Sequence, residues 1–229
     1  MLKLTPLILI VLYAVAMWLF SAWRLRQTLN ANSTPLDDPR LGPALDRLGA
    51  AMGLGRIRAH VYEIAPVNGL AAPDGRVFLT RGFLDQLDAG KVTEAELASV
   101  IAHELGHVTH GHARRRMMDF AGQNMVRAVL VGVFGRMVPV VGPWLAALVA
   151  SALAARLSRE DEYEADAFAA ALMVKAGFGT GPQKSLLARL GRLTGAGARP
   201  VAWLASHPET ARRIAAIEAL ERRWGIAAG

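Results

Sequence analysis

The chain has 229 residues, of which 53% are hydrophobic, and it carries a formal net charge of +7 and no cysteine. The absence of cysteine excludes disulfide partners and thiolate ligands, so any metal must be held by His and carboxylate side chains. The basic charge suits nucleic acid in principle, but no zinc-finger spacing, RNA-binding signature or basic-aromatic interleaving accompanies it. We therefore expect no nucleic-acid partner, and anionic lipid headgroups fit better because the basic clusters adjoin apolar runs.

The N-terminal segment 1–27 predicts a transmembrane anchor. From Leu4 to Trp23 the chain is uncharged, and this run has about the 20 residues that a helix needs to cross a bilayer core. Trp23 and the following Arg24 suit the membrane interface. A cleaved signal peptide is the alternative, but the apolar run is long for one and no convincing cleavage site follows it. We expect a retained anchor in a lipid bilayer.

Residues 28–43 are rich in turn-forming residues and predict a linker, after which residues 44–229 form one domain. Alternating apolar residues predict two short strands, within 57–64 and 75–87, the second followed by a small helix. Asp74-Gly75 predicts a hairpin-type turn just before the second strand.

The apolar segment 125–157 is interrupted by arginines and prolines. We expect a membrane-dipping or internally packed helical hairpin there rather than a second span, because the uninterrupted part is short. Apolar periodicity predicts further helices over 158–177, 183–194 and 209–224.

The stretch IAHELGHVTHGH, residues 101–112, holds four of the six histidines. Thr93 followed by Glu96 predicts a capping box, so a helix begins near Glu94. Apolar residues continue at helical spacing, and nothing breaks the pattern before about Gly111. The histidine-rich stretch is therefore expected on a helix.

His103, Glu104 and His107 form an H-E-x-x-H motif on this helix. Spacing of four residues puts His103 and His107 on one face a turn apart, where both can reach a single zinc ion. Glu104 can reach the open fourth position of the metal as a general base. His110 lies too far along the axis to share the metal easily and His112 points away, so we expect both to be bystanders.

A third ligand must come from elsewhere, since Ala113 stands where a metzincin has its third His. The acidic stretch SREDEYEAD, residues 158–166, offers four candidate carboxylates: Glu160, Asp161, Glu162 and Glu164. Asp166 lies four residues after Glu162 on the same helical face, where it can accept the second N–H of a ligating imidazole, and this favours Glu162. Ser158 is a candidate N-cap for this helix.

The segment SHPETARRI, residues 206–214, predicts a second capping box formed by Ser206 and Glu209. His207 would project from the start of that helix. It is either a surface histidine or a donor to the oxyanion of a tetrahedral intermediate.

Four segments together resemble the HtpX and type I CAAX prenyl endopeptidase family of membrane-associated gluzincin metallopeptidases. They are HELGH (103–107), SREDEYEAD (158–166), SHPETARRI (206–214) and PVNGLAAPDGRVFLTRGFL (66–84). The resemblance implies a mostly helical α+β fold, with a small sheet beside the H-E-x-x-H helix and an N-terminal membrane helix. It also implies one Zn²⁺ per chain, bound by His103, His107 and Glu162, with Glu104 as the base.

The same resemblance assigns supporting roles. Asp166 would orient a ligating histidine, Arg159 would pair with a carboxylate near the site, and His207 would stabilise the intermediate. A substrate peptide would add as a strand beside a segment formed by Asn68, Gly69, Leu70 and Ala71. The alternative for that segment is a simple loop in which Asn-Gly forms a turn.

These features predict a membrane-anchored zinc endopeptidase that cleaves protein or peptide substrates. By resemblance, the substrates would be misfolded or unassembled membrane and envelope proteins, and the location a bacterial-type inner membrane. One alternative is a zinc-containing membrane scaffold or holdase without proteolytic activity, although a binder has no need of Glu104 as a base. Another is a latent protease whose zinc is covered until a trigger arrives.

Overall fold

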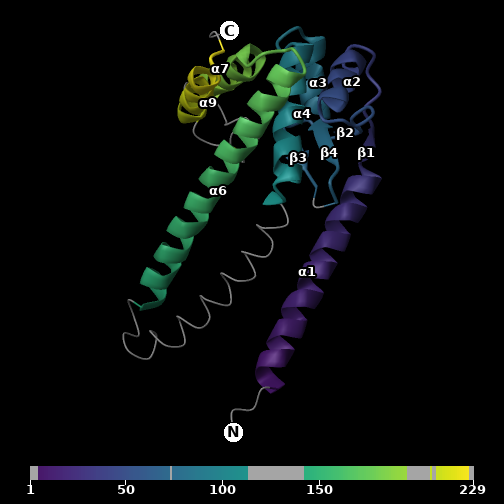
Figure 1. Cartoon of the computed structure of the whole chain (residues 1–229). Coiled ribbons are helices and arrows are strands. Elements are labelled where there is room, and N and C mark those ends of the chain that lie inside the picture. Colours follow the sequence, from purple (N-terminus) through teal and green to yellow (C-terminus); the bar gives the residue numbers. More distant parts are fainter. Residues whose placement is uncertain (1–4, 73, 113–141, 195–206, 208–209, 227–229) are drawn as a thin grey trace. The chain divides into compact units, whose positions relative to one another are not determined.

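The computed structural model describes residues 5–72, 74–112, 142–194, 207 and 210–226 (Figure 1). By its contacts the chain divides into two units. One comprises residues 1–31 and 113–158, and the other comprises residues 32–112 and 159–229. All the residues of the candidate site described below belong to the second unit.

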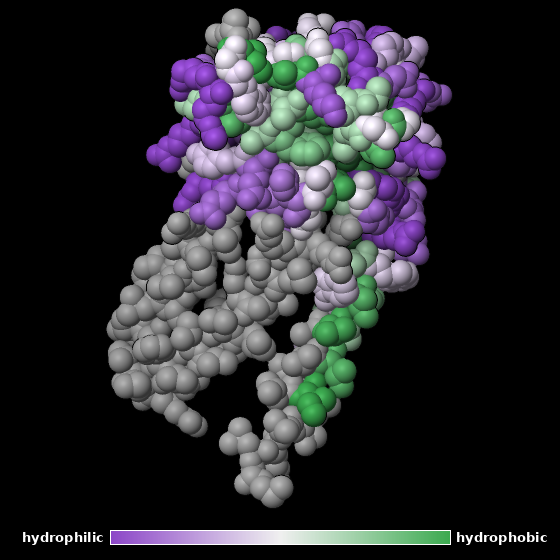
Figure 2. All heavy atoms as spheres, viewed as in Figure 1, coloured by the Kyte–Doolittle hydropathy of each residue, from purple (hydrophilic) through white to green (hydrophobic). Residues whose placement is uncertain are grey.

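In the first unit, helix α1 runs from Thr5 to Ala31 over the segment predicted as an anchor. Hydrophobic side chains follow the described part of α1 (Figure 2). Its exposed large hydrophobic residues are Ile8, Leu12, Tyr13, Val15, Met17, Leu19, Phe20, Trp23 and Leu25. Within the described ranges, no helix is both long enough and apolar enough to cross a membrane.

Helix α6 runs from Gly142 to Lys175 and is longer than predicted. The prediction of Ser158 as an N-cap is wrong, because Ser158 lies inside α6. The Ala- and Leu-rich run before Ser158 has no helix breaker after Pro143, so the helix continues through it. The hairpin predicted over 125–157 falls partly on residues 125–141, which lie outside the described residues, and the remainder forms the start of α6.

The second unit contains a mixed four-stranded sheet with the order β1-β2-β4-β3. The strands are β1 (Ser33–Pro35), β2 (Ala59–Tyr62), β3 (Gly69–Ala71) and β4 (Val77–Thr80). β2 and β4 are parallel, and each has an antiparallel partner on its other side. The predicted strands β2 and β4 are confirmed, as is the turn at Asp74-Gly75, where Gly75 adopts a φ of 87° within the β3–β4 hairpin. β3 lies at one edge of this sheet.

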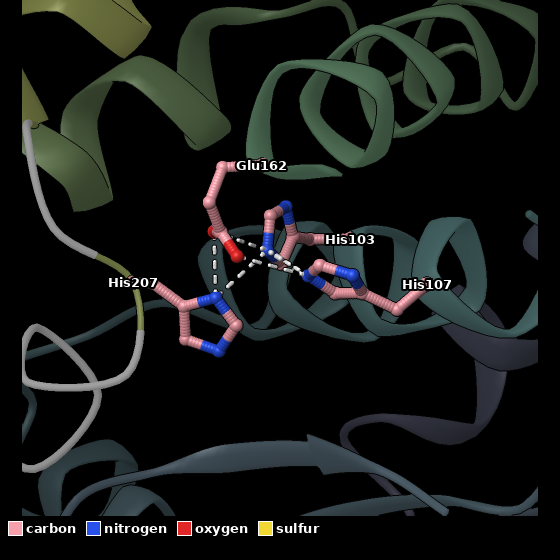
Figure 3. Close-up of side chains that lie close together, drawn as sticks. All are labelled: His103, His107, Glu162 and His207. Carbon is pink, nitrogen blue, oxygen red and sulfur yellow. Dashed lines mark hydrogen bonds and ion pairs between the residues drawn. The ribbon is translucent and has the colours of Figure 1, made fainter. Parts of the chain in front are cut away.

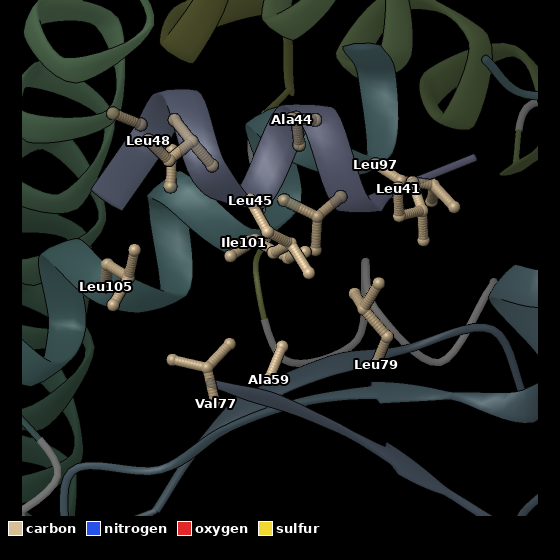
Figure 4. Close-up of a cluster of buried hydrophobic side chains, with 14 of the residues drawn as sticks. Leu41, Ala44, Leu45, Leu48, Ala59, Val77, Leu79, Leu97, Ile101 and Leu105 are labelled. Atoms are coloured by element: carbon tan, nitrogen blue, oxygen red, sulfur yellow. The ribbon is translucent and has the colours of Figure 1, made fainter. Parts of the chain in front are cut away.

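Helices α2 (Gly42–Ala51), α3 (Arg81–Asp88) and α4 (Glu94–Thr109) complete the N-terminal half of this unit. Aliphatic side chains from α2, α4 and the sheet meet in one buried cluster that includes Leu45, Ile101 and Leu79 (Figure 4). Burying each such side chain contributes about 1.5–3 kcal/mol. The motif helix α4 is therefore fixed by packing against both α2 and the sheet.

The start of α4 is fixed by the predicted capping box, which is confirmed. The Oγ1 of Thr93 accepts a hydrogen bond from the backbone N of Glu96 at 3.2 Å, and Glu96 Oε2 accepts one from the backbone N of Thr93 at 2.8 Å. The other carboxylate oxygen of Glu96 accepts hydrogen bonds from Ser185 and Arg189. Both donors belong to α7 (Gly181–Thr194), so the cap also joins α4 to α7. Every residue of α4 from Glu96 to His107 is buried.

Candidate active site and metal centre

Two helices and a residue that precedes a third bring a cluster of buried polar side chains together (Figure 3). His103 and His107 come from α4, Glu162 comes from α6, and His207 precedes α9 (Thr210–Trp224). The Nε2 atoms of the two α4 histidines lie 3.1 Å apart, and each lies 3.4 Å from an oxygen of Glu162. Tetrahedral zinc with bonds of about 2.0–2.1 Å places its ligands roughly 3.3 Å apart. The cluster therefore fits a tetrahedral metal ion.

Glu162 reaches the two histidines because α4 and α6 approach closely. A Cβ added at Gly106 would lie 2.9 Å from both the Cα and the carbonyl oxygen of Ala165. Only the absence of a side chain at Gly106 permits this contact, which lies beside His107 on α4 and less than one turn from Glu162 on α6. Of the four candidate carboxylates, Glu162 is the one that the structure brings to the metal-facing nitrogens of both histidines.

Asp166 holds the ring nitrogen of His103 that faces away from the cluster, Nδ1. This nitrogen lies 3.0 Å from Asp166 Oδ1, and a carboxylate can only accept, so Nδ1 carries the proton and Nε2 is free for a metal. Arg213 donates to both oxygens of Asp166, at 2.6 and 2.7 Å, and Gln183 donates to Oδ1 at 3.2 Å. Asp166 thus stands where the sequence predicted an orienting carboxylate.

Arg213 is a site residue that the sequence analysis did not identify. It lies on α9, is 1% exposed, and its Nη1 is also 3.6 Å from Glu162 Oε2. Attraction to Asp166 opposes the effect of burial and raises the pKa of Arg213, which stays a cation. Arg159, the basic residue that was expected near the site, forms no ion pair with a carboxylate among the described residues.

The ring nitrogen of His107 that faces away from the cluster, Nδ1, contacts His112. The two Nδ1 atoms lie 2.8 Å apart, and His112 is fully buried. The prediction that His112 points away from the site is therefore wrong. Gly111, with a φ of 66°, turns the chain back after α4 and places His112 against the helix instead of continuing its periodicity. His110 is exposed.

His207 occupies the fourth corner of the cluster. Its Nδ1 lies 3.4 Å from His103 Nε2 and 2.7 Å from Glu162 Oε2. Its other nitrogen, Nε2, lies 3.7 Å from Glu104 Oε1. His207 thus lies between the metal-facing atoms and the carboxylate of Glu104.

Glu104 is 1% exposed, and its Oε1 has no hydrogen-bond partner among the described residues. Burial raises the pKa of Glu104. An unsatisfied buried carboxylate oxygen is costly unless a bound group supplies a partner. Its position beside the ligand atoms fits a site completed by a metal ion and water.

The pKa values of the two α4 histidines are shifted in opposite directions. Burial and Arg213 act to lower the pKa of His103, but hydrogen bonds to Asp166 and Glu162 outweigh them and raise it to about 9. Burial lowers the pKa of His107 to about 3. Burial acts to raise the pKa of Glu162, but its hydrogen bonds to the histidines hold the pKa well below its usual range. Glu162 is therefore ionised beside the two histidines, the form in which a carboxylate can bind a metal cation.

The predicted substrate segment lies at the sheet edge. Gly69, Leu70 and Ala71 form β3, and the backbone of Asn68 exchanges hydrogen bonds with Thr80 at the end of β4. Gly69 packs against Glu104 of α4. An edge strand thus lies beside the proposed base.

Comparison with known proteins agrees with this geometry. The model of the family described as Peptidase family M48 matches residues 43–221. A protease HtpX homolog from Acidiphilium cryptum is 33% identical over 155 residues, covering 58% of this chain and 51% of the relative. A putative beta-barrel assembly-enhancing protease from Vibrio cholerae is 28% identical over 203 residues, which cover 81% of this chain and 40% of the relative.

The mitochondrial metalloendopeptidase OMA1 of Schizosaccharomyces pombe is 29% identical over 178 residues, which cover 76% of this chain and 50% of the relative. The chain spans about half the length of these three relatives. Since the family model covers well over half of the chain and includes the whole site, the chain belongs to peptidase family M48.

Proposed function

We propose that this chain is a zinc-dependent metalloendopeptidase that cleaves internal peptide bonds of protein substrates. The observation that carries the proposal is the convergence of His103, His107 and Glu162 near Glu104, whose buried Oε1 accepts no hydrogen bond from the described residues. A scaffold or holdase needs no such buried base. Family membership and the names of the relatives support the same activity.

Zinc is the metal that suits these ligands. Two imidazoles and one carboxylate at tetrahedral spacing match a catalytic zinc site, whereas Mg²⁺ and Ca²⁺ prefer sites made of oxygen atoms. A zinc ion bound here supplies a Lewis acid that polarises the scissile carbonyl and lowers the pKa of water. Asp166 and Arg213 would keep His103 in the tautomer that presents Nε2.

Glu104 would act as the proton carrier. The raised pKa of its buried carboxylate makes it a stronger base than an exposed glutamate. It would accept a proton from the attacking water as the new carbon–oxygen bond forms. It would then give that proton to the amide nitrogen as the carbon–nitrogen bond breaks, so that one water is consumed and no net proton is released in this step.

We further propose that the substrate adds as a strand to β3. Main-chain pairing at a sheet edge tolerates many side chains and extends the peptide along the site. The packing of Gly69 against Glu104 places this edge next to the base. Asn68→Ala tests this role, because an unaltered KM and kcat for peptide cleavage would remove Asn68 from the binding segment.

Casein digestion tests the endopeptidase activity. The purified chain with one equivalent of zinc should generate internal fragments that mass spectrometry identifies. A chelator should stop the digestion and added zinc should restore it. A fully zinc-loaded chain that leaves casein intact would favour the holdase.

The position of His207 supports a second candidate, a latent form of the same protease. Its Nδ1 lies where the open fourth position of a catalytic site is expected. We propose that His207 covers this position in the resting protein and leaves it when substrate arrives. Once displaced, the same side chain can donate to the oxyanion of the intermediate, the role that the resemblance gives it.

His207→Ala distinguishes these two roles of His207. If covering the site limits the rate, the variant should digest casein faster than the wild type. If oxyanion stabilisation dominates, turnover should fall by roughly 10²–10³-fold. The three remaining ligands should retain zinc in both cases.

We also propose that the protein associates with a bilayer through α1, which supports a membrane location and makes membrane and envelope proteins candidate substrates. The exposed apolar side chains of α1 support this proposal. One relative is named for enhancing beta-barrel assembly, which suggests envelope proteins as substrates. Liposome flotation of the full chain and of a variant lacking residues 1–27 tests the attachment, since both should float equally if α1 has no role.

A further inference from the structure

The end of α4 carries a chain of polar contacts that leads away from the proposed metal site. Because Gly111 has a φ of 66°, the chain reverses direction directly after α4, and His112 packs against the end of that helix. The Nδ1 atoms of His107 and His112 then lie 2.8 Å apart, and both rings are buried. On its other side, His112 Nε2 lies 3.0 Å from Glu164 Oε2 and 3.6 Å from Asp161 Oδ1.

The direction of each hydrogen bond follows from the ligand set. His107 faces His103 and Glu162 with Nε2, so a metal there leaves the proton on Nδ1, which must donate. The Nδ1 of His112 must therefore accept, which puts the His112 proton on Nε2. That proton is donated to Glu164, whose carboxylate can only accept. One arrangement of protons satisfies all three groups.

The same side chains offer a rival interpretation as a second metal site. His110, His112 and Glu164 each offer one ligand atom within 4.8 Å of the others. A metal on Nε2 of His112 would move its proton to Nδ1, which faces Nδ1 of His107. The two Nδ1 atoms, 2.8 Å apart, would then both carry protons, and neither could accept a hydrogen bond from the other. Metal binding at His107 and at His112 would thus exclude each other while this contact holds.

We propose that His112 is a positioning residue for His107, acting through a His107–His112–Glu164 chain of hydrogen bonds. This proposal rests on the metal site of the proposed function. The role of His112 toward His107 parallels the role of Asp166 toward His103. His112 fixes the ring of His107 and the nitrogen that it presents, and the carboxylate at the far end makes Nδ1 of His112 a better acceptor. Removing such a partner lowers metal affinity by about 10–100-fold.

Zinc affinity measured by chelator competition tests this proposal on three variants of the full chain. His112→Leu removes the acceptor and should bind zinc about 10–100-fold more weakly. His112→Asn keeps an acceptor oxygen near the place of Nδ1 and should stay within a few-fold of the wild type. His110→Leu removes the ring that stacks on His112, with centroids 5.4 Å apart, but leaves the contact between His107 and His112, so affinity should stay within a few-fold of the wild type. Cobalt substitution adds a spectroscopic readout, since a looser His107 should alter the visible absorption bands in His112→Leu.

Three results would overturn the proposal. Wild-type affinity in His112→Leu would show that the contact is irrelevant, and equal losses in the Leu and Asn variants would show that only packing matters. A second equivalent of zinc that is lost in His110→Leu would establish the rival metal site. Thermal unfolding of the metal-free variants shows whether each is folded. Tight zinc binding without peptide cleavage in the wild type would reject the proposed protease activity and leave the role of His112 standing.

Discussion

Gly69 of the edge strand β3 lies directly against the carboxylate of Glu104. A Cβ at Gly69 would be 3.1 Å from Glu104 Oε1 and 2.8 Å from Cγ1 of Val100. A side chain at position 69 would therefore collide with side chains of α4. This contact places the proposed substrate edge beside the proposed base.

Gly69→Ala should impair catalysis without removing the metal. The added methyl group would push β3 away from α4 or displace the carboxylate of Glu104, and misplacement by about 1 Å can lower the rate roughly 100-fold. Peptide kinetics should therefore show a fall in kcat/KM of about 10–100-fold with unchanged zinc content. Gly55→Ala is the control, since its Cβ meets nothing within 4 Å. Wild-type kcat/KM in Gly69→Ala would exclude the close approach as a functional feature.

Gly106→Val should separate α4 from α6. The side chain would overlap the backbone of Ala165, and overpacking of this kind costs about 1–3 kcal/mol in free energy of unfolding. Zinc affinity should fall as well, because Glu162 moves away from His107. Denaturant unfolding and chelator competition measure the two effects. Valine is a better helix former than glycine, so helix propensity cannot explain a loss at position 106. Ala95→Val, in the first turn of the same helix, controls for adding a branched side chain to α4, and equal losses in both variants would contradict the packing argument.

Arg213→Met should destabilise the fold by leaving Asp166 as an unpaired buried charge. Breaking such a pair costs about 3–5 kcal/mol. The double variant Arg213→Met/Asp166→Asn removes the charges of both partners and should recover part of the loss, because the two sites are coupled. Denaturant unfolding of the single and double variants measures the coupling. Strictly additive effects would show that the two side chains do not depend on each other, and Arg212→Met serves as the exposed control.

Metal removal should lower thermal stability. The metal binds the folded site, so zinc at 100 times its Kd should add about 2.7 kcal/mol to the free energy of unfolding. Calorimetry with and without a chelator measures the shift in Tm. His103→Ala should abolish the zinc-dependent part of this shift. A shift of the same size in that variant would place the stabilising metal elsewhere.

Local signals in the sequence predicted α4 well. The capping box of Thr93 and Glu96 fixed its start, and helical spacing placed His103 and His107 on one face. The same spacing argument favoured Glu162 because Asp166 follows it by one turn. In the structure Glu162 contacts both α4 histidines, and Asp166 contacts His103.

Features that depend on chain reversal or on tertiary packing were missed. His112 was placed by continuing the periodicity of α4, but Gly111 in the left-handed region breaks that periodicity. A glycine just after the last helical turn was the signal available. Arg212 and Arg213 look alike in sequence, and only the docking of α9 shows that Arg213 is buried against Asp166.

Zinc content and peptide hydrolysis, measured on the same samples of wild type, Glu104→Gln and Glu94→Gln, test the ligand set and the base together. Glu94 is the matched control because it is exposed in the first turn of α4. All three proteins should bind one zinc per chain, and hydrolysis should fall by about 10²–10⁴-fold in Glu104→Gln alone. Full hydrolysis by zinc-loaded Glu104→Gln, or an inactive wild type with a full complement of zinc, would contradict the proposed mechanism.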